Sequence, residues 1–280
     1  MQTIDSGGAR ISYERTGSGP AVLLIQGVGQ EGRAWGPQVE ALRPWFTVTH
    51  FDHRGVGRSS KPDASLSIEQ MAEDALAVMD AEGIEDFHVV GHSMGGVVAQ
   101  QLALVAPRRV LSLSLLCTFS RGRDALRLDG WMVWAGIRSR IGTRRSRGAA
   151  FLEMLVPTEG LAPADTVEIQ ARLTSVFGRD LADQPPVAMR QLQALARYDA
   201  SDRLASLRYI PTLVVSGELD RIARPSSGRA LAAAIPGARY VEVPGAGHAL
   251  PAYHPDVINK GLLDHLLAAE EISSAVMSWV

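Results

Sequence analysis

Short runs rich in Val, Leu and Ile recur along the chain, and segments with helical spacing of apolar residues separate them. The run Ala21–Ile25 is apolar at every position, which is typical of a strand buried on both faces of a sheet. The predicted strands of this kind are Ala21–Ile25, Phe46–Phe51, Phe87–Val90, Val110–Leu116, Thr212–Gly217 and Tyr240–Val243. Residues 2–16 predict an antiparallel hairpin that turns at Ser6-Gly7-Gly8.

Helical periodicity marks the segments between these runs. Ile68, Met71, Ala75 and Val78 share one face of a predicted helix that begins near Ser67, where a capping box with Gln70 is expected. Further helices are predicted from Ser93 to Leu104, over Pro225–Ile235 and over Pro255–Leu267. This alternation predicts an α/β protein with a mostly parallel sheet of about eight strands and flanking helices.

The alternation stops between residues 120 and 205, where helical patterns continue without a convincing strand. We therefore predict an α/β core made of residues 1–119 and 206–280, with the helical segment 120–205 inserted after the sixth strand. Residues 269–280 either extend the last helix or pack against a neighbour.

Composition excludes several classes of function. The chain of 280 residues is 46% apolar and 21% charged, and its net charge of −2 gives no field that attracts nucleic acid or an anionic membrane. It has no basic start before an apolar run and no apolar stretch of roughly 18 residues. We expect a cytoplasmic monomer or homodimer without nucleic-acid or membrane partners. The single cysteine, Cys117, excludes an internal disulfide and is interpreted as a core thiol.

One strand-to-helix turn carries candidate chemistry. The run that ends at Val90 leads into Gly91-His92-Ser93-Met94-Gly95 and then into a helix. A serine in such a turn has a strained backbone and an exposed hydroxyl, and the glycines let strand and helix approach closely. The helix N-terminus behind Ser93 offers unpaired N–H groups to a developing negative charge.

Two loops after the later strands supply an acid and a base. The first contains Glu218 and Asp220, and the second contains His248. Because ligands of open α/β sheets bind outside the carboxyl ends of the strands, these loops can converge on Ser93. A serine nucleophile needs an imidazole to take its proton and a carboxylate to orient that imidazole. Ser93, Asp220 and His248 are the candidate catalytic residues, with Glu218 as an alternative acid and His254 as an alternative base.

These motifs resemble the α/β-hydrolase superfamily, over the whole chain except the insertion. Within this superfamily, the chain resembles most strongly the capped branch of carboxylesterases and 3-oxoadipate enol-lactonases. The resemblance implies that Gly91–Gly95 is the nucleophile elbow and that the insertion is the cap. It also implies an oxyanion hole formed by the backbone N–H groups of Val28 and Met94. The chain departs from the family where Gln26, instead of the usual histidine, precedes Gly27.

The expected function is hydrolysis of a small or medium carboxylic ester or lactone through an acyl-enzyme, without cofactor or metal. Gln26, Trp131 and Trp134 are candidate pocket residues, although the tryptophans also fit the core of the cap. Alternatives are a C–C bond hydrolase, a perhydrolase, a lyase, a thioesterase or a non-catalytic binding protein on the same fold. The basic cluster Arg138–Arg147 is interpreted as a solvated face, with docking of an acidic group as the alternative.

Overall fold

The sheet begins with the predicted antiparallel hairpin and continues as parallel strands. The computed structural model describes residues 1–61, 66–126 and 129–277. The strands are β1 (Gln2–Ser6), β2 (Ala9–Thr16), β3 (Ala21–Ile25), β4 (Thr47–Phe51), β5 (Phe87–His92), β6 (Val110–Leu116), β7 (Thr212–Gly217) and β8 (Arg239–Val243). They form an eight-stranded sheet in the order β1-β2-β4-β3-β5-β6-β7-β8. β2 pairs antiparallel with both β1 and β4, whereas every pair from β4 to β8 is parallel.

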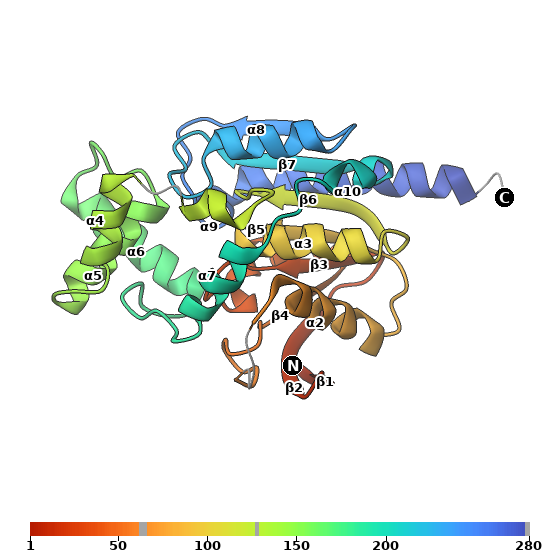
Figure 1. Cartoon of the computed structure of the whole chain (residues 1–280), viewed down its shortest axis with the longest axis horizontal. Helices are drawn as coiled ribbons and strands as arrows, with labels where there is room; N and C mark the ends of the chain where they lie inside the picture. The colour runs from red at the N-terminus through yellow and green to blue at the C-terminus, as the bar shows by residue number, and fades with distance from the viewer. Residues whose placement is uncertain (62–65, 127–128, 278–280) are drawn as a thin grey trace.

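Helices cover both faces of this sheet (Figure 1). The α-helices are α1 (Gly36–Leu42), α2 (Ile68–Ala81), α3 (Met94–Val105), α4 (Gly130–Arg138), α5 (Arg144–Leu155), α6 (Pro163–Phe177), α7 (Ala188–Arg197), α8 (Pro225–Ala234), α9 (Leu250–Tyr253) and α10 (Pro255–Met277). The 3₁₀ helices are η1 (Gly32–Trp35), η2 (Gly122–Leu126) and η3 (Leu204–Tyr209). α3 packs against β5 and β6 on one face, and α1 and α10 pack together on the other. None of the helices in the described ranges combines the length and apolar character that crossing a membrane requires.

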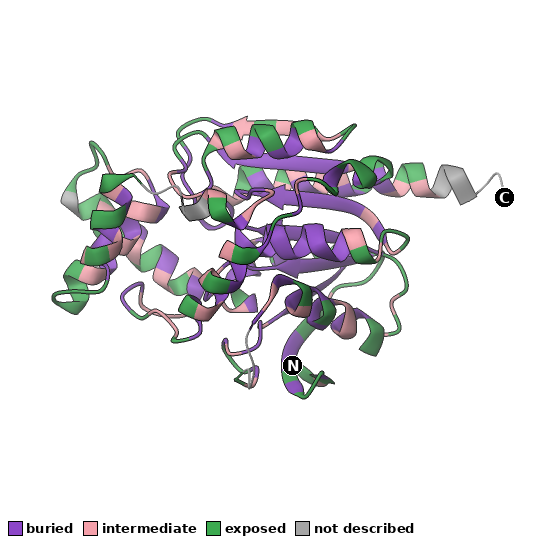
Figure 2. Ribbon diagram, viewed as in Figure 1, coloured by how far each residue is buried: buried purple, intermediate pink, exposed green. Residues whose placement is uncertain are grey.

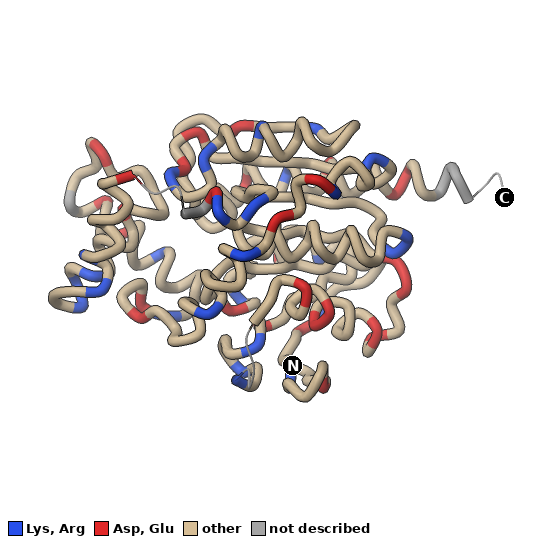
Figure 3. The backbone as a smooth tube through the Cα atoms, in the orientation of Figure 1, with Lys and Arg blue, Asp and Glu red and all other residues tan. Residues whose placement is uncertain are grey.

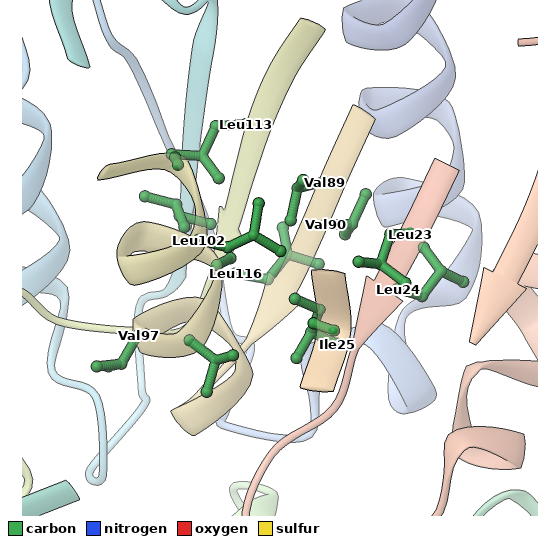
Figure 4. Close-up of a cluster of buried hydrophobic side chains, with 14 of the residues drawn as sticks. Leu23, Leu24, Ile25, Val89, Val90, Val97, Leu102, Leu113 and Leu116 are labelled. Carbon is green, nitrogen blue, oxygen red and sulfur yellow. The ribbon is translucent and has the colours of Figure 1, made fainter. Parts of the chain in front are cut away.

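The central strands form the main hydrophobic core. Leu23, Leu24 and Ile25 of β3 are fully buried, and Figure 4 shows them beside side chains of β5 and α3. Fully burying one such side chain contributes about 1.5–3 kcal/mol relative to leaving it exposed. The strands that end near the candidate site are therefore held firmly in place.

Helices α4–α7 lie between β6 and β7, where the alternation of strand and helix stops in the sequence. Within the described part of this segment, an isolated bridge between Arg121 and Asp199 is the sole β-pairing. A second hydrophobic cluster, which includes Leu152, Leu173 and Phe177, joins α5 and α6 to Ala249. Figure 2 shows many exposed positions on them, in contrast to the buried strands.

The predicted fold class is confirmed, and most predicted elements begin or end within a residue or two of the observed bounds. Ser67 caps α2 by accepting the Gln70 N–H at 3.1 Å, but the Gln70 side chain contacts Glu73 instead of completing the capping box. The last helix, α10, continues to Met277, so the alternative in which the C-terminal residues extend this helix is confirmed as far as residue 277. Residues 278–280 of the predicted tail lie outside the described ranges.

Candidate active site

Ser93 occupies the turn between β5 and α3 in a conformation that non-glycine residues rarely adopt. Its backbone has φ +56° and ψ −122°. A Cβ atom at Gly91 would lie 2.4 Å from the Gly95 carbonyl oxygen, and one at Gly95 would lie 2.0 Å from the Ile25 oxygen. The two glycines are therefore required for α3 to pack so closely on the sheet. Strain of this kind persists where the surrounding structure enforces it, as it does at many functional sites.

Ser93, His248 and Asp220 form a continuous chain of hydrogen bonds. His248 Nε2 lies 2.9 Å from Ser93 Oγ, and His248 Nδ1 lies 2.8 Å from Asp220 Oδ2. The three residues follow β5, β8 and β7, and all are buried. An imidazole placed in this way can accept the serine proton at Nε2 while the carboxylate holds the Nδ1–H.

The carboxylate of Asp220 is itself held by backbone N–H groups that follow it in the same loop. Its Oδ1 accepts the N–H groups of Ile222 and Ala223, both at 2.8 Å. Glu218 instead accepts the Gly245 N–H at 2.8 Å and is exposed. The structure thus brings Asp220, rather than Glu218, to His248.

Two further histidines, His92 and His254, have surroundings that differ from those of His248. His92 Nε2 donates to the His248 carbonyl oxygen at 2.9 Å, and burial lowers the His92 pKa to about 3. His92 is thus a neutral imidazole that supports the backbone of His248. His254 packs edge-on against Tyr253, and burial lowers its pKa.

Cys117 lies at the end of β6, fully buried as the sequence predicts, with φ +48°. Burial, followed by the negative charge of Asp220, raises the pKa of the thiol well above its usual value. The group stays protonated and acts as a weak hydrogen-bond donor beside Asp220.

Two backbone N–H groups next to Ser93 are available to a ligand. The N–H groups of Val28 and Met94 donate to no other residue in the described part of the chain. The loop after β3 passes close to Ser93, since a Cβ at Gly27 would lie 3.2 Å from the Ser93 Cβ. Gln26 donates from Nε2 to the Phe51 oxygen at 2.6 Å, so this side chain bonds within the core.

A contact that the sequence analysis did not single out joins this loop to the inserted helices. The Gly29 N–H donates to Oε1 of Gln191, on α7, at 2.7 Å. Gln191 lies on the same face of α7 as the buried Ala188 and Leu195. A polar residue on the apolar face of a predicted helix is the signal that could have identified it.

A cleft of about 390 Å³ lies between the inserted helices and the loops after β7 and β8. Its lining includes Trp131, Asp220 and Gly247, and Arg221 stacks over the Trp131 ring at 4.2 Å. The structure places Trp134 elsewhere, with 58% of its surface exposed on α4 and no part in lining this cleft. Gln26 is also absent from the lining, because its side chain is buried and donates to the Phe51 oxygen.

The arginines of the segment 138–147 gather where α4 meets α5 (Figure 3). Arg138 pairs with Glu153 at 2.9 Å, and Arg144 pairs with Asp180 at 3.0 Å and also with Asp183. Ion pairs among side chains as exposed as these contribute little to stability, which agrees with a largely solvated face. In the described ranges, no cluster of three or more His, Cys, Asp or Glu side chains could hold a metal ion.

Comparison with known proteins adds independent findings. Residues 20–255 match the family described as alpha/beta hydrolase fold. The chain is 34% identical over 270 residues to a protein of Azorhizobium caulinodans named as the carbamate hydrolase RutD, covering 94% of this chain and 97% of that one. An enol-lactonase structure from Burkholderia xenovorans has a TM-score of 0.79 and 28% identity, covering 95% of this chain and 100% of the other. A thermophilic esterase from Thermogutta terrifontis has a TM-score of 0.78 and 26% identity, covering 96% and 99%.

Proposed function

This chain belongs to the alpha/beta hydrolase fold family, and from that premise we propose a serine hydrolase that cleaves a small or medium carboxylic ester or lactone. One observation carries the proposal: the hydrogen-bonded chain from Ser93 Oγ through His248 to Asp220. The structural neighbours named as an enol-lactonase and an esterase support the ester or lactone class.

In the proposed reaction, Ser93 Oγ attacks the carbonyl carbon while His248 Nε2 takes the hydroxyl proton. His248 then gives that proton to the departing alcohol oxygen, and an acyl-enzyme remains on Ser93. A water molecule, deprotonated by His248, then attacks the acyl carbonyl. The bond from the acyl carbon to Ser93 Oγ breaks, the acid leaves, and His248 returns the proton to Ser93 Oγ. Asp220 fixes the imidazole tautomer and stabilises the imidazolium that forms in each half of the reaction.

We assign the oxyanion hole to the backbone N–H groups of Val28 and Met94. Both are unpaired within the described residues, and Met94 is the first residue of α3, where the positive end of the helix dipole lies. Donors that are oriented before the reaction stabilise the negative charge of the tetrahedral intermediate without further reorganisation. Gln26 does not weaken this arrangement, because both donors belong to the backbone.

We further propose that residues 120–205 form a cap over the site and that Trp131 borders the substrate pocket. Two contacts support the cap. The Ala249 N–H, directly after His248, donates to the Leu155 oxygen of α5 at 2.9 Å, and a Cβ at Gly247 would lie 2.8 Å from Pro157 Cδ. The substrate pocket is then enclosed between the core loops and helices α4–α7.

A fluorophosphonate label tests the serine mechanism directly. We expect one covalent adduct per chain, located by peptide mass spectrometry on Ser93, because His248 activates this hydroxyl alone. His248→Ala should slow the labelling at least about a hundredfold, since general-base assistance contributes that much or more. A folded wild-type protein that takes up no label would favour the non-catalytic binding protein.

A carbamate is the second candidate substrate, and the relative named as the carbamate hydrolase RutD favours it. The same serine can attack a carbamate carbonyl. A carbamoyl-enzyme then takes the place of the acyl-enzyme. A p-nitrophenyl carbamate assayed beside p-nitrophenyl esters separates the two classes by their relative kcat/KM.

A further inference from the structure

The loop Gly27–Gln30, here called the oxyanion loop, is held in place by the inserted helices as well as by the core. The hydrogen bond from the Gly29 N–H to Gln191 Oε1 spans 162 residues of sequence and is buried. Gln191 is fully buried. A donor and an acceptor so distant in sequence meet only when α7 is docked on the core.

Gly29 is confined on a second side by the same segment. Its φ is +66°, and a Cβ on it would lie 2.9 Å from Pro185 Cγ. On the core side, the Gln30 N–H closes a turn onto the Gly27 oxygen at 3.3 Å. The peptide between Val28 and Gly29 is therefore fixed by α7 and Pro185 on one side and by the turn on the other.

The Val28 N–H belongs to the planar peptide between Gly27 and Val28, whose oxygen accepts the Gln30 N–H at 3.3 Å. Because the Gly29 N–H and the Val28 carbonyl form the next planar unit, holding that N–H on Gln191 limits rotation about ψ of Val28 and so restrains the orientation of the Val28 N–H. A donor that is free to rotate must be oriented during the reaction, which removes the advantage of a prepared oxyanion hole.

The amide of Gln191 is also unusual as a purely structural group. Its Oε1 must face Gly29, because only the oxygen can accept the N–H. That orientation leaves Nε2 buried without a partner among the residues that the structure describes. An unpaired buried donor is unfavourable for stability, so packing alone does not explain a glutamine at this position.

We infer that Gln191 is a positioning residue that couples docking of the cap to assembly of the oxyanion hole. The inference rests on the proposed serine mechanism and deepens it. Gln191 acts through Gly29 and Val28 and does not touch the reacting atoms. The cap keeps other anchors without it, including Ala249 N–H to Leu155 O and the Arg33 guanidinium to Gly178 O at 2.7 Å.

The test compares Gln191→Leu with Gln193→Leu, a matched change at an exposed position of the same helix. For Gln191→Leu we expect kcat on p-nitrophenyl esters to fall about 10- to 100-fold, less than the 10²- to 10³-fold typical of removing an oxyanion donor outright. KM should change less than about threefold, since ground-state binding does not use the oxyanion hole. Gln191→Glu keeps an acceptor for Gly29 and should lose less kcat than Gln191→Leu.

A second readout separates positioning from general damage. An alkyl trifluoromethyl ketone forms a tetrahedral oxyanion on the serine, so its Ki should rise in Gln191→Leu by the same factor as kcat/KM falls. Ki for the product acid should stay constant, and the thermal unfolding midpoint should match that of Gln193→Leu.

Equal kcat and equal ketone Ki in the two leucine variants would overturn the inference, as would a rise in KM with kcat unchanged. A failure of the proposed function looks different. Wild type and Ser93→Ala would then hydrolyse esters at the same rate, whatever the residue at position 191.

Discussion

At the scale of single residues, the candidate site depends on which side chain each turn delivers to Ser93. Glu218 and Asp220 leave the same strand, β7, only two residues apart. Two N–H groups orient Asp220 toward His248, whereas the Glu218 carboxylate bonds to Gly245 on the exposed side of the loop. The sequence left both acids open, because side-chain direction in a loop depends on backbone hydrogen bonds that no spacing pattern encodes.

This difference leads to a paired prediction. Asp220→Asn should lower kcat by about 10³- to 10⁴-fold, because an amide can stabilise the wrong imidazole tautomer and cannot balance the imidazolium charge. Glu218→Gln should change kcat less than about threefold. The measurement is steady-state ester hydrolysis at pH 8 for both variants. A larger loss of kcat in Glu218→Gln than in Asp220→Asn would show that Glu218, and not Asp220, is the acid that orients His248.

Trp134 shows why pocket residues are harder to predict than catalytic ones. Helix α4 has a buried side with Met132 and Ala135 and an exposed side with Val133, Trp134 and Ile137. Since apolar residues occupy both sides, periodicity does not tell which side faces the core. The packing of α4 against α5 decides that Trp131 lines the cleft and that Trp134 faces away from it.

At the scale of elements, the strands and their helices were predictable because buried parallel strands leave continuous apolar runs. Val110–Leu116 and Thr212–Gly217 were predicted with their observed bounds. The ends of β5, β7 and β8 bring Ser93, Asp220 and His248 together, so the same pattern also predicts where the candidate site lies.

The arrangement of the inserted helices was not predictable in the same way. Part of their attachment to the core uses backbone groups, such as the Ala249 N–H and the Leu155 oxygen, that are present in any sequence. The buried side chain of Gln191 carries a hydrogen bond to the oxyanion loop, and Pro185 packs against Gly29 of the same loop. The sequence therefore predicts that an insertion exists, but the structure is needed to show how its helices pack against the core loops.

At the scale of the whole molecule, several buried histidines make stability depend on pH. Burial lowers the pKa values of His53 and His265 to about 4 and that of His92 to about 3. Unfolding restores ordinary values near 6.5, so the unfolded chain binds more protons between about pH 6.5 and 4. The free energy of unfolding should therefore be fully retained above pH 6.5 and fall as the pH decreases through this window.

For each imidazole whose pKa is lowered to about 4 or below, the free energy of unfolding should fall by on the order of 2 kcal/mol as the pH decreases from 7 to 5. In urea denaturation at these two pH values, His53→Gln should lose less stability than wild type, because one buried protonation site is gone. Identical losses in both proteins would show that His53 is not held in its neutral form by burial.

The role of Ser93 as nucleophile is tested by hydrolysis of p-nitrophenyl esters of increasing acyl length by wild type, Ser93→Ala and the control Ser206→Ala. Ser206 is exposed, and within the described ranges its hydroxyl donates to the Arg203 oxygen, outside the candidate site, so loss of this hydroxyl should leave turnover unchanged. We expect turnover by wild type and Ser206→Ala, with at least about a 10⁴-fold loss in Ser93→Ala. Turnover that survives in Ser93→Ala would contradict the assignment of Ser93 as the nucleophile.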